Sequence, residues 1–372
     1  MPTITAVETR VAPFSSATWL DEERIATPLS WYPRFAERRS SWRGPGADVV
    51  WVLLRAGDEL FGIGQSRGGA VTESAIRAHL APLLIGQDAA GVVELTDQLR
   101  RALAPYAGGL FGAMAVSAVE LALWDLGARA LGAPLHRILG GHGRPLPHYL
   151  TIGSAELFGD AAAFVERAGG VEVVKVPMAY GPADGRTSLR RNVDRVERLR
   201  ALLPTAVGIA VDCFSSWNPP YAVEFARACE GLGLAWIEEP FAADEVTGYM
   251  RLRDGLAGTV RVATGEHLAG VRTAEELIAR EAIDVIQTDV TWCGGLGVAR
   301  TIAALAAEHG VRFVPHASAL QPWALHLLSA CAPESMAETL VLDIAADVGA
   351  PAAPGAVGVG LSPEDAGFGS RA

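Results

Sequence analysis

The sequence predicts an α/β protein with an N-terminal α+β capping domain and a modified TIM (β/α)7β barrel. The first observation is that, from residue 141 onward, short apolar segments rich in β-branched residues alternate with segments of helical periodicity. The second is that an acid or a base closes one apolar segment after another, at intervals of about 25 residues, as in repeated βα units. The third is that the chain before residue 141 has a different organisation, described next.

The N-terminal part begins with a strand expected over residues 2–14, followed by a long irregular segment rich in Trp, Pro and Arg. Long irregular segments in compact domains are usually binding loops or lids. Two strands, DVVWVLLRA and ELFGIGQS, are joined by a tight turn at Gly57 and Asp58, which indicates a β-hairpin. Helical periodicity then dominates from Thr72 to Leu131. A hairpin followed by helices is an α+β unit, so we place the capping domain over residues 1–140.

Eight strands are expected in the barrel, which we place over residues 141–343. In chain order they are LPHYLTIG, VEVVKVPM, AVGIAVDCF, LAWIEEP, VRVATGE, DVIQTDV, VRFVPHA and AETLVLD. Residues 344–372 are rich in Ala, Gly and Pro, so this C-terminal tail buries little surface by itself. We expect it to run back over the capping domain.

Composition narrows the class of protein. Half of the residues are apolar, enough for a substantial core, and the net charge of −11 argues against a general nucleic-acid or anionic-membrane surface. No N-terminal signal pattern is visible, and no run of about 18 apolar residues that could span a bilayer. The four cysteines lack zinc-like spacing, which favours reduced thiols. We therefore expect a cytoplasmic protein that binds a small molecule and neither nucleic acid nor membrane.

Acids at three successive strand ends form a candidate metal site. Asp212, Glu238 and Glu266 each close an expected strand, and in a barrel these strand ends converge on one mouth. Three carboxylates form a hard oxygen cage suited to Mg²⁺. A lone acid at a strand end is more often a helix cap or a surface charge, but three at matching positions argue for a shared site. Glu238 and Glu239 point to opposite faces of a strand, and alternation alone leaves the choice between them open.

Seven motifs also occur in a fixed order along the chain. They are IATPLSWYP, RRSSW, KVPMAYGPADG, WIEEP, ATGEH, DVTWCGGLG and VPHAS. With VELALWDLGARALGAPLHRILGG before the barrel, they resemble the mandelate racemase branch of the enolase superfamily, closest to acid-sugar dehydratases of the L-rhamnonate dehydratase type. The resemblance covers nearly the whole chain. It implies one Mg²⁺ per subunit, held by Asp212, Glu238 and Glu266, a His–Asp pair formed by His316 and Asp289, and a homo-oligomer.

His316 is the expected general base. A carboxylate on one ring nitrogen fixes the tautomer and raises the basicity of the other, which is the role we expect for Asp289. Without such a partner, a histidine after an apolar strand is usually a hydrogen-bonded structural group.

Lys175 lies two residues before Pro177, on the same face of one strand. Many relatives carry a second lysine at the latter position, as a base on the opposite face of the substrate. Racemisation needs a base on each face, whereas elimination can proceed with one. Lys175 is expected either to steady the substrate carboxylate or to form an ion pair inside the barrel.

Four further residues are expected around the substrate. Arg39, in the irregular N-terminal segment, aligns with the family and offers a guanidinium fork; a solvated basic loop is the alternative. His267 follows a metal-ligand position, although strand alternation turns it away. Glu338 faces the mouth by the family match, or is paired in the core. Trp31 lines the distal pocket, or packs its own loop.

The expected activity is the Mg²⁺-dependent dehydration of a sugar acid, L-rhamnonate or a related aldonic acid, to a 2-keto-3-deoxy acid. The C2 proton is removed and the C3 hydroxyl is lost, which is a lyase reaction. The alternatives are a racemase or epimerase of the same superfamily and a non-catalytic relative that binds a ligand. A barrel metallohydrolase is disfavoured because it usually has several metal histidines. The chain departs from L-rhamnonate-type sequences near Thr18, where they carry a histidine, and in SALQPWALHLL, so the particular acid stays open.

Overall fold

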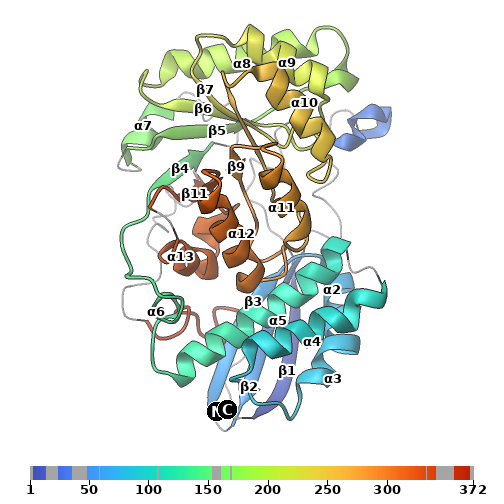
Figure 1. The fold of residues 1–372 in the computed structure, drawn as a ribbon, viewed down its shortest axis with the longest axis vertical. Helices are drawn as coiled ribbons and strands as arrows, with labels where there is room; N and C mark the ends of the chain where they lie inside the picture. Colours follow the sequence, from blue (N-terminus) through green and yellow to red (C-terminus); the bar gives the residue numbers. More distant parts are fainter. Residues whose placement is uncertain are drawn as a thin grey trace.

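The protein, analysed as a computed structural model, forms two sheets surrounded by helices (Figure 1). Structural statements below concern residues 3–13, 24–35, 48–57, 59–106, 109–152, 161–167, 170–331, 333–340 and 356–368. A small antiparallel sheet belongs to the N-terminal part of the chain and a large parallel sheet to the part that follows. The expected fold class is confirmed.

The N-terminal sheet has three antiparallel strands in chain order, β1 (Ile4–Ala12), β2 (Val49–Ala56) and β3 (Leu60–Ser66). The expected hairpin joins β2 to β3, and Gly57 in its turn has φ +60°, a conformation that favours glycine. Helices then cover this sheet, as the periodicity predicts. They are α2 (Gly69–Ala75), α3 (Ala81–Leu84), α4 (Val92–Leu103) and α5 (Gly109–Ala130).

Two glycines allow α5 to lie directly on the sheet. Gly62 and Gly64 alternate along β3 and therefore share one face. A Cβ at either position would overlap the backbone carbonyl of Ala122 or Ala118 in α5. The helix thus contacts the strand through its backbone, and most of its length is buried.

One helix of the described chain, α5, is long and apolar enough to cross a membrane by length and composition. The helix contains Glu120 and Asp125, so it is not an uninterrupted apolar run of about 18 residues, the feature for which the sequence was searched. In the fold, 67% of its most apolar 18-residue stretch is buried inside the protein, as in the core helix of a globular domain.

All eight expected barrel strands form, in the expected chain order, and pair as one parallel sheet with helices outside it. The strands are β4 (His148–Thr151), β5 (Val173–Pro177), β6 (Gly208–Asp212), β7 (Leu234–Glu238), β8 (Arg261–Thr264), β9 (Val285–Ile286), β10 (Arg312–Phe313) and β11 (Ala337–Leu340). The helices are α6 (Leu135–Ile138), α7 (Ala161–Arg167), α8 (Ser188–Leu202), α9 (Pro219–Ala228), α10 (Val246–Leu256), α11 (Arg272–Ala279), α12 (Leu296–Glu308) and α13 (Pro322–Leu328).

The barrel has a seam between β10 and β11, which share no backbone ladder among the described residues. Bonds to side chains bridge it. The Ala317 N–H donates to Glu338 Oε2 (2.6 Å), and the Glu338 N–H donates to Ser318 Oγ (2.7 Å). Ser318 begins the short 3-10 turn η9 (Ser318–Leu320) that follows β10. The seam is therefore held by reciprocal bonds between the last strand and this turn.

The described part of the C-terminal tail, residues 356–368, lies against the N-terminal part. Gly358 N–H donates to the Ala133 carbonyl (3.0 Å), and Val359 N–H donates to Asp125 Oδ1 (2.8 Å) on α5. These contacts tie the end of the chain to the helix that joins the two sheets.

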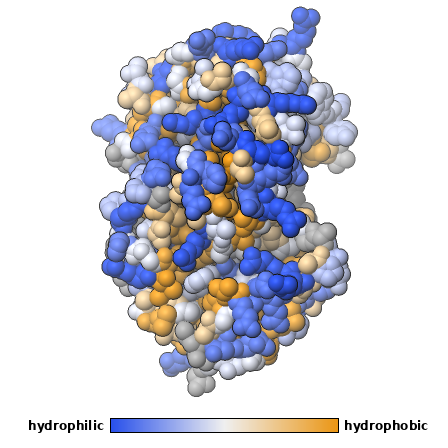
Figure 2. All heavy atoms as spheres, in the orientation of Figure 1, coloured by the Kyte–Doolittle hydropathy of each residue, from blue (hydrophilic) through white to orange (hydrophobic). Residues whose placement is uncertain are grey.

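One buried apolar cluster runs from β2, β3 and α5 into the barrel, so the two parts share a core. On the face drawn in Figure 2, hydrophilic side chains predominate at the top, over α8 and α9, while apolar ones gather across the middle. The limits 1–140, 141–343 and 344–372 stay a proposal for the domains, and residue 343 falls outside the described residues.

Candidate active site

Alternation along the strands brings most of the candidate residues together, whereas Glu266 follows β8 after Gly265, which has φ 133°, and is outside the alternating pattern. One inward layer of the barrel is a buried core made by Tyr149, Val173, Ala210, Trp236, Ala263, Val285, Val314 and Met336. Two residues further along the chain, the same face reaches the C-terminal strand ends and becomes polar. The polar layer is Thr151, Lys175, Asp212, Glu238, Gln287, His316 and Glu338. Because Trp236 faces inward, Glu238 does too, which resolves the choice that alternation alone left open.

Asp212, Glu238 and Glu266 form a buried carboxylate cluster, in which one oxygen of each lies within 4.8 Å of the others. Burial raises the pKa of Glu238 to about 8 and that of Asp212 to about 6, and it also raises the pKa of Glu266. The protein alone thus leaves part of their negative charge uncompensated. Three hard oxygen donors with this charge fit a small divalent cation such as Mg²⁺.

Lys175 is the cation buried beside this cluster. Its Nζ lies 2.7 Å from Glu238 Oε1, 2.8 Å from Glu338 Oε1 and 3.4 Å from Asp212 Oδ2. Burial disfavours its charge, but these carboxylates outweigh burial and raise the pKa of Lys175 well above its usual value. The Trp236 Nε1–H donates to Glu238 Oε2 (3.0 Å), so both oxygens of Glu238 are fixed. The ion pair that the sequence offered as one role of Lys175 is therefore present.

His316 lies between Asp289 and the carboxylate cluster. Its Nδ1 is 2.8 Å from Asp289 Oδ2, and its Nε2 is 3.3 Å from Glu266 Oε2. Burial lowers the pKa of His316, but Glu266, Asp289 and Glu338 together raise it to about 10. Because Glu266 contributes most among these acids, the charge of the imidazole depends on what Glu266 binds.

Asp289 accepts bonds on both of its oxygens. Thr291 donates to Oδ1 through its N–H and its Oγ1–H, both at 2.7 Å, and Gln321 Nε2 donates to Oδ2 at 2.9 Å. The sequence analysis missed both donors. Thr291 carries a local signal, since an Asp carboxylate often accepts from the backbone N–H two residues further on. Gln321 carries none, because it comes from the turn before α13.

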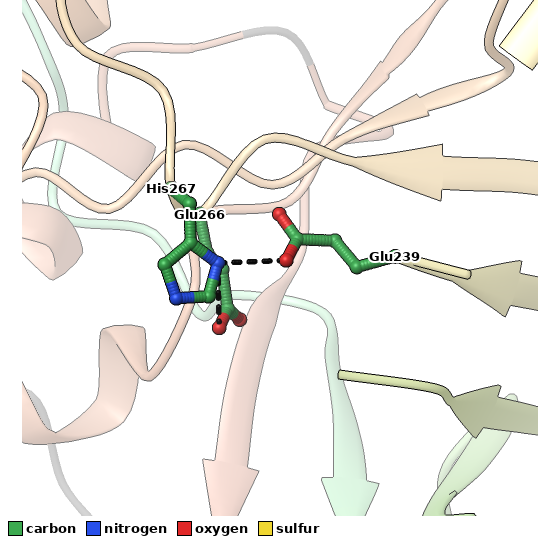
Figure 3. A group of neighbouring side chains, drawn as sticks. All are labelled: Glu239, Glu266 and His267. Carbon is green, nitrogen blue, oxygen red and sulfur yellow. Dashed lines mark hydrogen bonds and ion pairs between the residues drawn. The ribbon is translucent and has the colours of Figure 1, made fainter. Parts of the chain in front are cut away.

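Figure 3 shows His267 beside the carboxylates of Glu239 and Glu266. Its Nδ1 lies 2.7 Å from Glu239 Oε2 and 3.4 Å from Glu266 Oε1. Glu239 follows β7 in the left-handed region, with φ 36°, and is buried. Burial opposes the charge on His267, but the two carboxylates raise its pKa to about 9. The mouth thus holds a second imidazole–carboxylate pair, in which the partner is Glu239, the acid that the sequence left as the alternative to Glu238.

Glu338 directs both oxygens to protein partners. Oε1 accepts from Thr151 Oγ1 (2.6 Å) and pairs with Lys175, while Oε2 accepts from the Ala317 N–H. Burial opposes its charge, but Lys175, His316 and these bonds lower the pKa of Glu338 to about 2. The core pairing that the sequence left open for Glu338 is present.

The two other expected substrate residues are not brought into this cluster. Trp31 lies on the 3-10 turn η1 (Pro28–Trp31), is 63% exposed, and does not line the cavity described below. Its role at the substrate therefore stays a prediction. Arg39 lies outside the described residues, so its role stays a prediction.

A cavity of about 730 Å³ opens beside the cluster, between the loops after β6 to β9 and the start of α5. His267 and Trp292 line it on the barrel side, and Leu110, Phe111 and Arg67 line it on the other. The Trp292 ring centroid lies 5.6 Å from that of His267 and 5.3 Å from that of His316. The cavity therefore contacts His267 directly, and Trp292 lies between it and His316.

An α+β cap beside a parallel barrel, with three acids at successive strand ends, defines an enzyme of the enolase type. Family models agree: residues 159–370 match the enolase C-terminal domain-like model, and residues 45–140 match the N-terminal domain model of mandelate racemase / muconate lactonizing enzyme. The chain belongs to the mandelate racemase / muconate lactonizing enzyme family of the enolase superfamily.

Individual relatives are dehydratases. A Caldivirga maquilingensis protein assigned as an L-rhamnonate dehydratase is 34% identical over 318 residues, 86% of this chain and 77% of the relative. The crystal structure of L-rhamnonate dehydratase from Gibberella zeae is 30% identical with a TM-score of 0.82, covering 91% of this chain and 83% of that one. A Mg-complexed structure of the rhamnonate dehydratase of that organism is 27% identical with a TM-score of 0.83, covering 97% and 94%. The chain is an enzyme of the lyase type.

Proposed function

We propose that this protein is a cytoplasmic, homo-oligomeric enzyme that dehydrates a sugar acid with one Mg²⁺ per subunit. The substrate is L-rhamnonate or a related aldonic acid, and the product is the 2-keto-3-deoxy acid. The observation that carries the proposal is the position of His316, with Nδ1 on Asp289 and Nε2 toward Glu266 of the carboxylate cluster. Proton removal next to a carboxylate needs a base and a cation site side by side, and this mouth offers both. The names of the relatives support the substrate class.

The carboxylate cluster provides a cation site that lowers the energetic cost of removing the C2 proton. A hydrogen next to a carboxylate is very weakly acidic, because its removal adds a second negative charge to that group. Mg²⁺, when bound by Asp212, Glu238 and Glu266, supplies positive charge that stabilises this extra charge by several kcal/mol. The adjoining cavity of about 730 Å³ leaves room for the distal carbons of the acid.

His316 transfers the proton from C2 to the leaving hydroxyl. In the proposed reaction Nε2 takes the C2 proton, while Asp289 holds Nδ1–H and stabilises the imidazolium that forms. The electron pair left at C2 expels the C3 hydroxyl, which leaves as water after accepting the proton from His316. The resulting enol then tautomerises to the 2-keto-3-deoxy acid. One water molecule is lost, and His316 returns to its starting state.

Epimerisation at C2 is the second candidate, because His267 places another imidazole at the same mouth, 2.7 Å from Glu239. Against it, the second position on β5 is Pro177, which has no basic group, and it lies in register with Asp212. Elimination needs one base, so we prefer dehydration.

The test is a keto-acid assay over a panel of aldonic and aldaric acids, with Mg²⁺ and with EDTA. We expect a metal-dependent keto-acid signal on one or a few aldonic acids. Exchange of the C2 hydrogen for deuterium from the solvent, without keto acid, would favour epimerisation. Silence in both assays, together with absence of Mg²⁺ binding by calorimetry, would contradict the proposal.

His316→Asn tests the base directly. We expect kcat to fall by roughly 10²–10⁴, the usual contribution of general base catalysis, because the amide cannot accept the proton. Mg²⁺ binding should persist, since Asp212, Glu238 and Glu266 are unchanged. Full activity of this variant would remove His316 from the mechanism.

A further inference from the structure

Gln321 occupies the junction between turn η9 and α13, directly behind the His316–Asp289 pair. Its side chain is buried, with 6% of the residue exposed. The amide Nε2 donates to Asp289 Oδ2 (2.9 Å) and approaches the backbone carbonyl of His316 (3.3 Å). One amide group therefore contacts both the acid that holds the imidazole and the main chain that carries it.

The orientation of this amide is fixed by its partners. Both contacts of Nε2 are acceptors, a carboxylate and a carbonyl, so the NH₂ end must face them. Oε1 is then buried with no hydrogen-bond partner among the described residues. A buried acceptor without a partner costs free energy, so stability alone does not explain a polar residue here.

The backbone around His316 explains why such a contact is needed. β10 ends at Phe313, it pairs with β9 over only two residues, and no described ladder joins it to β11. His316 thus lies beyond the end of one of the two shortest strands, beside the seam. Ladder hydrogen bonds that fix the metal-ligand positions on β6 and β7 are missing at this position, and bonds to side chains must orient the imidazole instead.

We propose that Gln321 is a positioning residue that holds the imidazole of His316 in place for proton transfer. Thr291 donates to Oδ1 of Asp289, and Gln321, from the turn before α13, donates to Oδ2. With Gln321 present, the carboxylate has one orientation, and the His316 ring follows it. The inference rests on the proposed function of His316 as the base and adds a residue that has no contact with the carboxylate cluster.

Gln321→Met tests the role, because methionine keeps nearly the same length and volume but has no N–H donor. We expect kcat to fall on the order of 10-fold, since small misplacement of a catalytic group is costly. KM and the Mg²⁺ dissociation constant should stay within about twofold, and Tm should hold because the unpartnered Oε1 is removed. Unchanged kcat would overturn the proposal, as would a loss explained entirely by a smaller folded fraction.

A spectroscopic measurement on the metal-free protein separates this inference from the proposed activity. In protein labelled with ¹⁵N-histidine, the Nδ1–H proton of His316 is assigned by its absence in His316→Asn. We expect Gln321→Met to shift this signal and to speed its exchange with water, whether or not any acid is dehydrated. An identical signal in the variant would overturn the proposal even if the wild type dehydrates its substrate.

A shorter amide and a matched control complete the design. Gln321→Asn retains the N–H donor on a shorter side chain, so its kcat and its His316 signal should lie between those of the wild type and of Gln321→Met. This variant replaces Gln321→Met in the test if the methionine variant fails to fold. Asn192 is a buried amide on α8 that bonds the backbone of Tyr180, outside the site. Asn192→Leu should lower Tm and leave both kcat per folded protein and the His316 signal unchanged. If it altered them as Gln321→Met does, the effect would be general and the proposal would fail.

Discussion

At the scale of single residues, Lys175 holds one positive charge among the buried carboxylates of Asp212, Glu238 and Glu338. Glu266 adds a fourth carboxylate close by. The acids outnumber the cation, and burial raises the pKa of Glu238 to about 8. Lys175 therefore compensates part of the charge, and the remaining negative charge favours the binding of a divalent cation.

Lys175→Met should destabilise the metal-free protein by about 3–5 kcal/mol, the usual cost of removing one partner of a buried ion pair. This destabilisation comes from the buried carboxylates that lose their cation, so bound Mg²⁺ should restore part of the lost stability. Mg²⁺ should therefore raise the Tm of the variant more than that of the wild type. Thermal unfolding in EDTA and in Mg²⁺ measures both. Arg101→Met, at an exposed ion pair with Asp97, is the control and should change stability little. An equal Mg²⁺-induced gain in variant and wild type would contradict this role of Lys175.

At the scale of elements, α5 connects the N-terminal sheet to the barrel. Glu120 projects from it to the start of α12, where Oε2 accepts from the Leu296 N–H (2.7 Å) and Oε1 from the Gly297 N–H (2.8 Å). The Trp124 Nε1–H donates to Oε1 as well (2.9 Å). A helix N-terminus favours negative charge, yet burial dominates and raises the pKa of Glu120 to about 7. The contact between the two helices thus carries a cost when the carboxyl is charged.

Glu120→Gln should change the pH dependence of stability. The carboxyl has a higher pKa in the folded than in the unfolded protein, so the folded state binds the proton more tightly. Its contribution is present below the unfolded pKa of 4.5 and is lost as the pH rises through about 7. The glutamine of the variant does not titrate, so the variant does not lose this stability. Its free energy of unfolding, relative to that of the wild type, should therefore rise by on the order of 3 kcal/mol between pH 4.5 and pH 8. Urea unfolding across this range measures it, and parallel curves would contradict the assignment.

At the scale of the whole molecule, three distant segments meet at a pair of buried histidines. His136 on α6 and His326 on α13 stack with ring centroids 5.2 Å apart, next to the C-terminal tail at Gly358. The His136 N–H donates to His326 Nδ1 (3.0 Å), so neutral His326 carries its proton on Nε2. Protonation of Nδ1 would set two donors against each other. Burial and the neighbouring His136 accordingly lower the pKa of His326 to about 4.

His326→Gln should make the fold less sensitive to acid. Because the pKa of His326 is lower in the folded protein, its stabilising contribution is present above pH 6.5 and is lost as the pH falls toward 4. We expect the free energy of unfolding of the wild type to fall by on the order of 2 kcal/mol as the pH drops from 6.5 toward 4. The variant should not show this fall, because Gln does not titrate and can accept the same backbone hydrogen bond. Tm from pH 7.5 to 4.5, with proteolysis of residues 356–368 as a local probe, measures the difference. The same acid sensitivity in both proteins would contradict this role.

Much of the fold was predictable because its signals are local. Alternation gave all eight barrel strands in order, and the turn at Gly57 gave the hairpin. Three acids at matching strand ends were enough to predict the carboxylate cluster, whose oxygens do converge. Gln321 was missed because nothing in its neighbourhood marks it, and the pairing of Glu239 with His267 was not foreseen. The first acts across a turn and the second through a left-handed φ that strand alternation does not foresee.

The sequence by itself determined the eight barrel strands and their order, and alternation divided the side chains of each strand between two opposite faces. The acids at successive strand ends indicated a shared mouth with His316, but the structure decided which face of each strand lines it. Only the tertiary structure decided how these groups are paired. Lys175 bonds carboxylates from three other strands, and His326 meets the main chain of a helix in the N-terminal half. Such contacts depend on distances of a few ångströms between segments far apart in the chain, and local propensity carries no information about them.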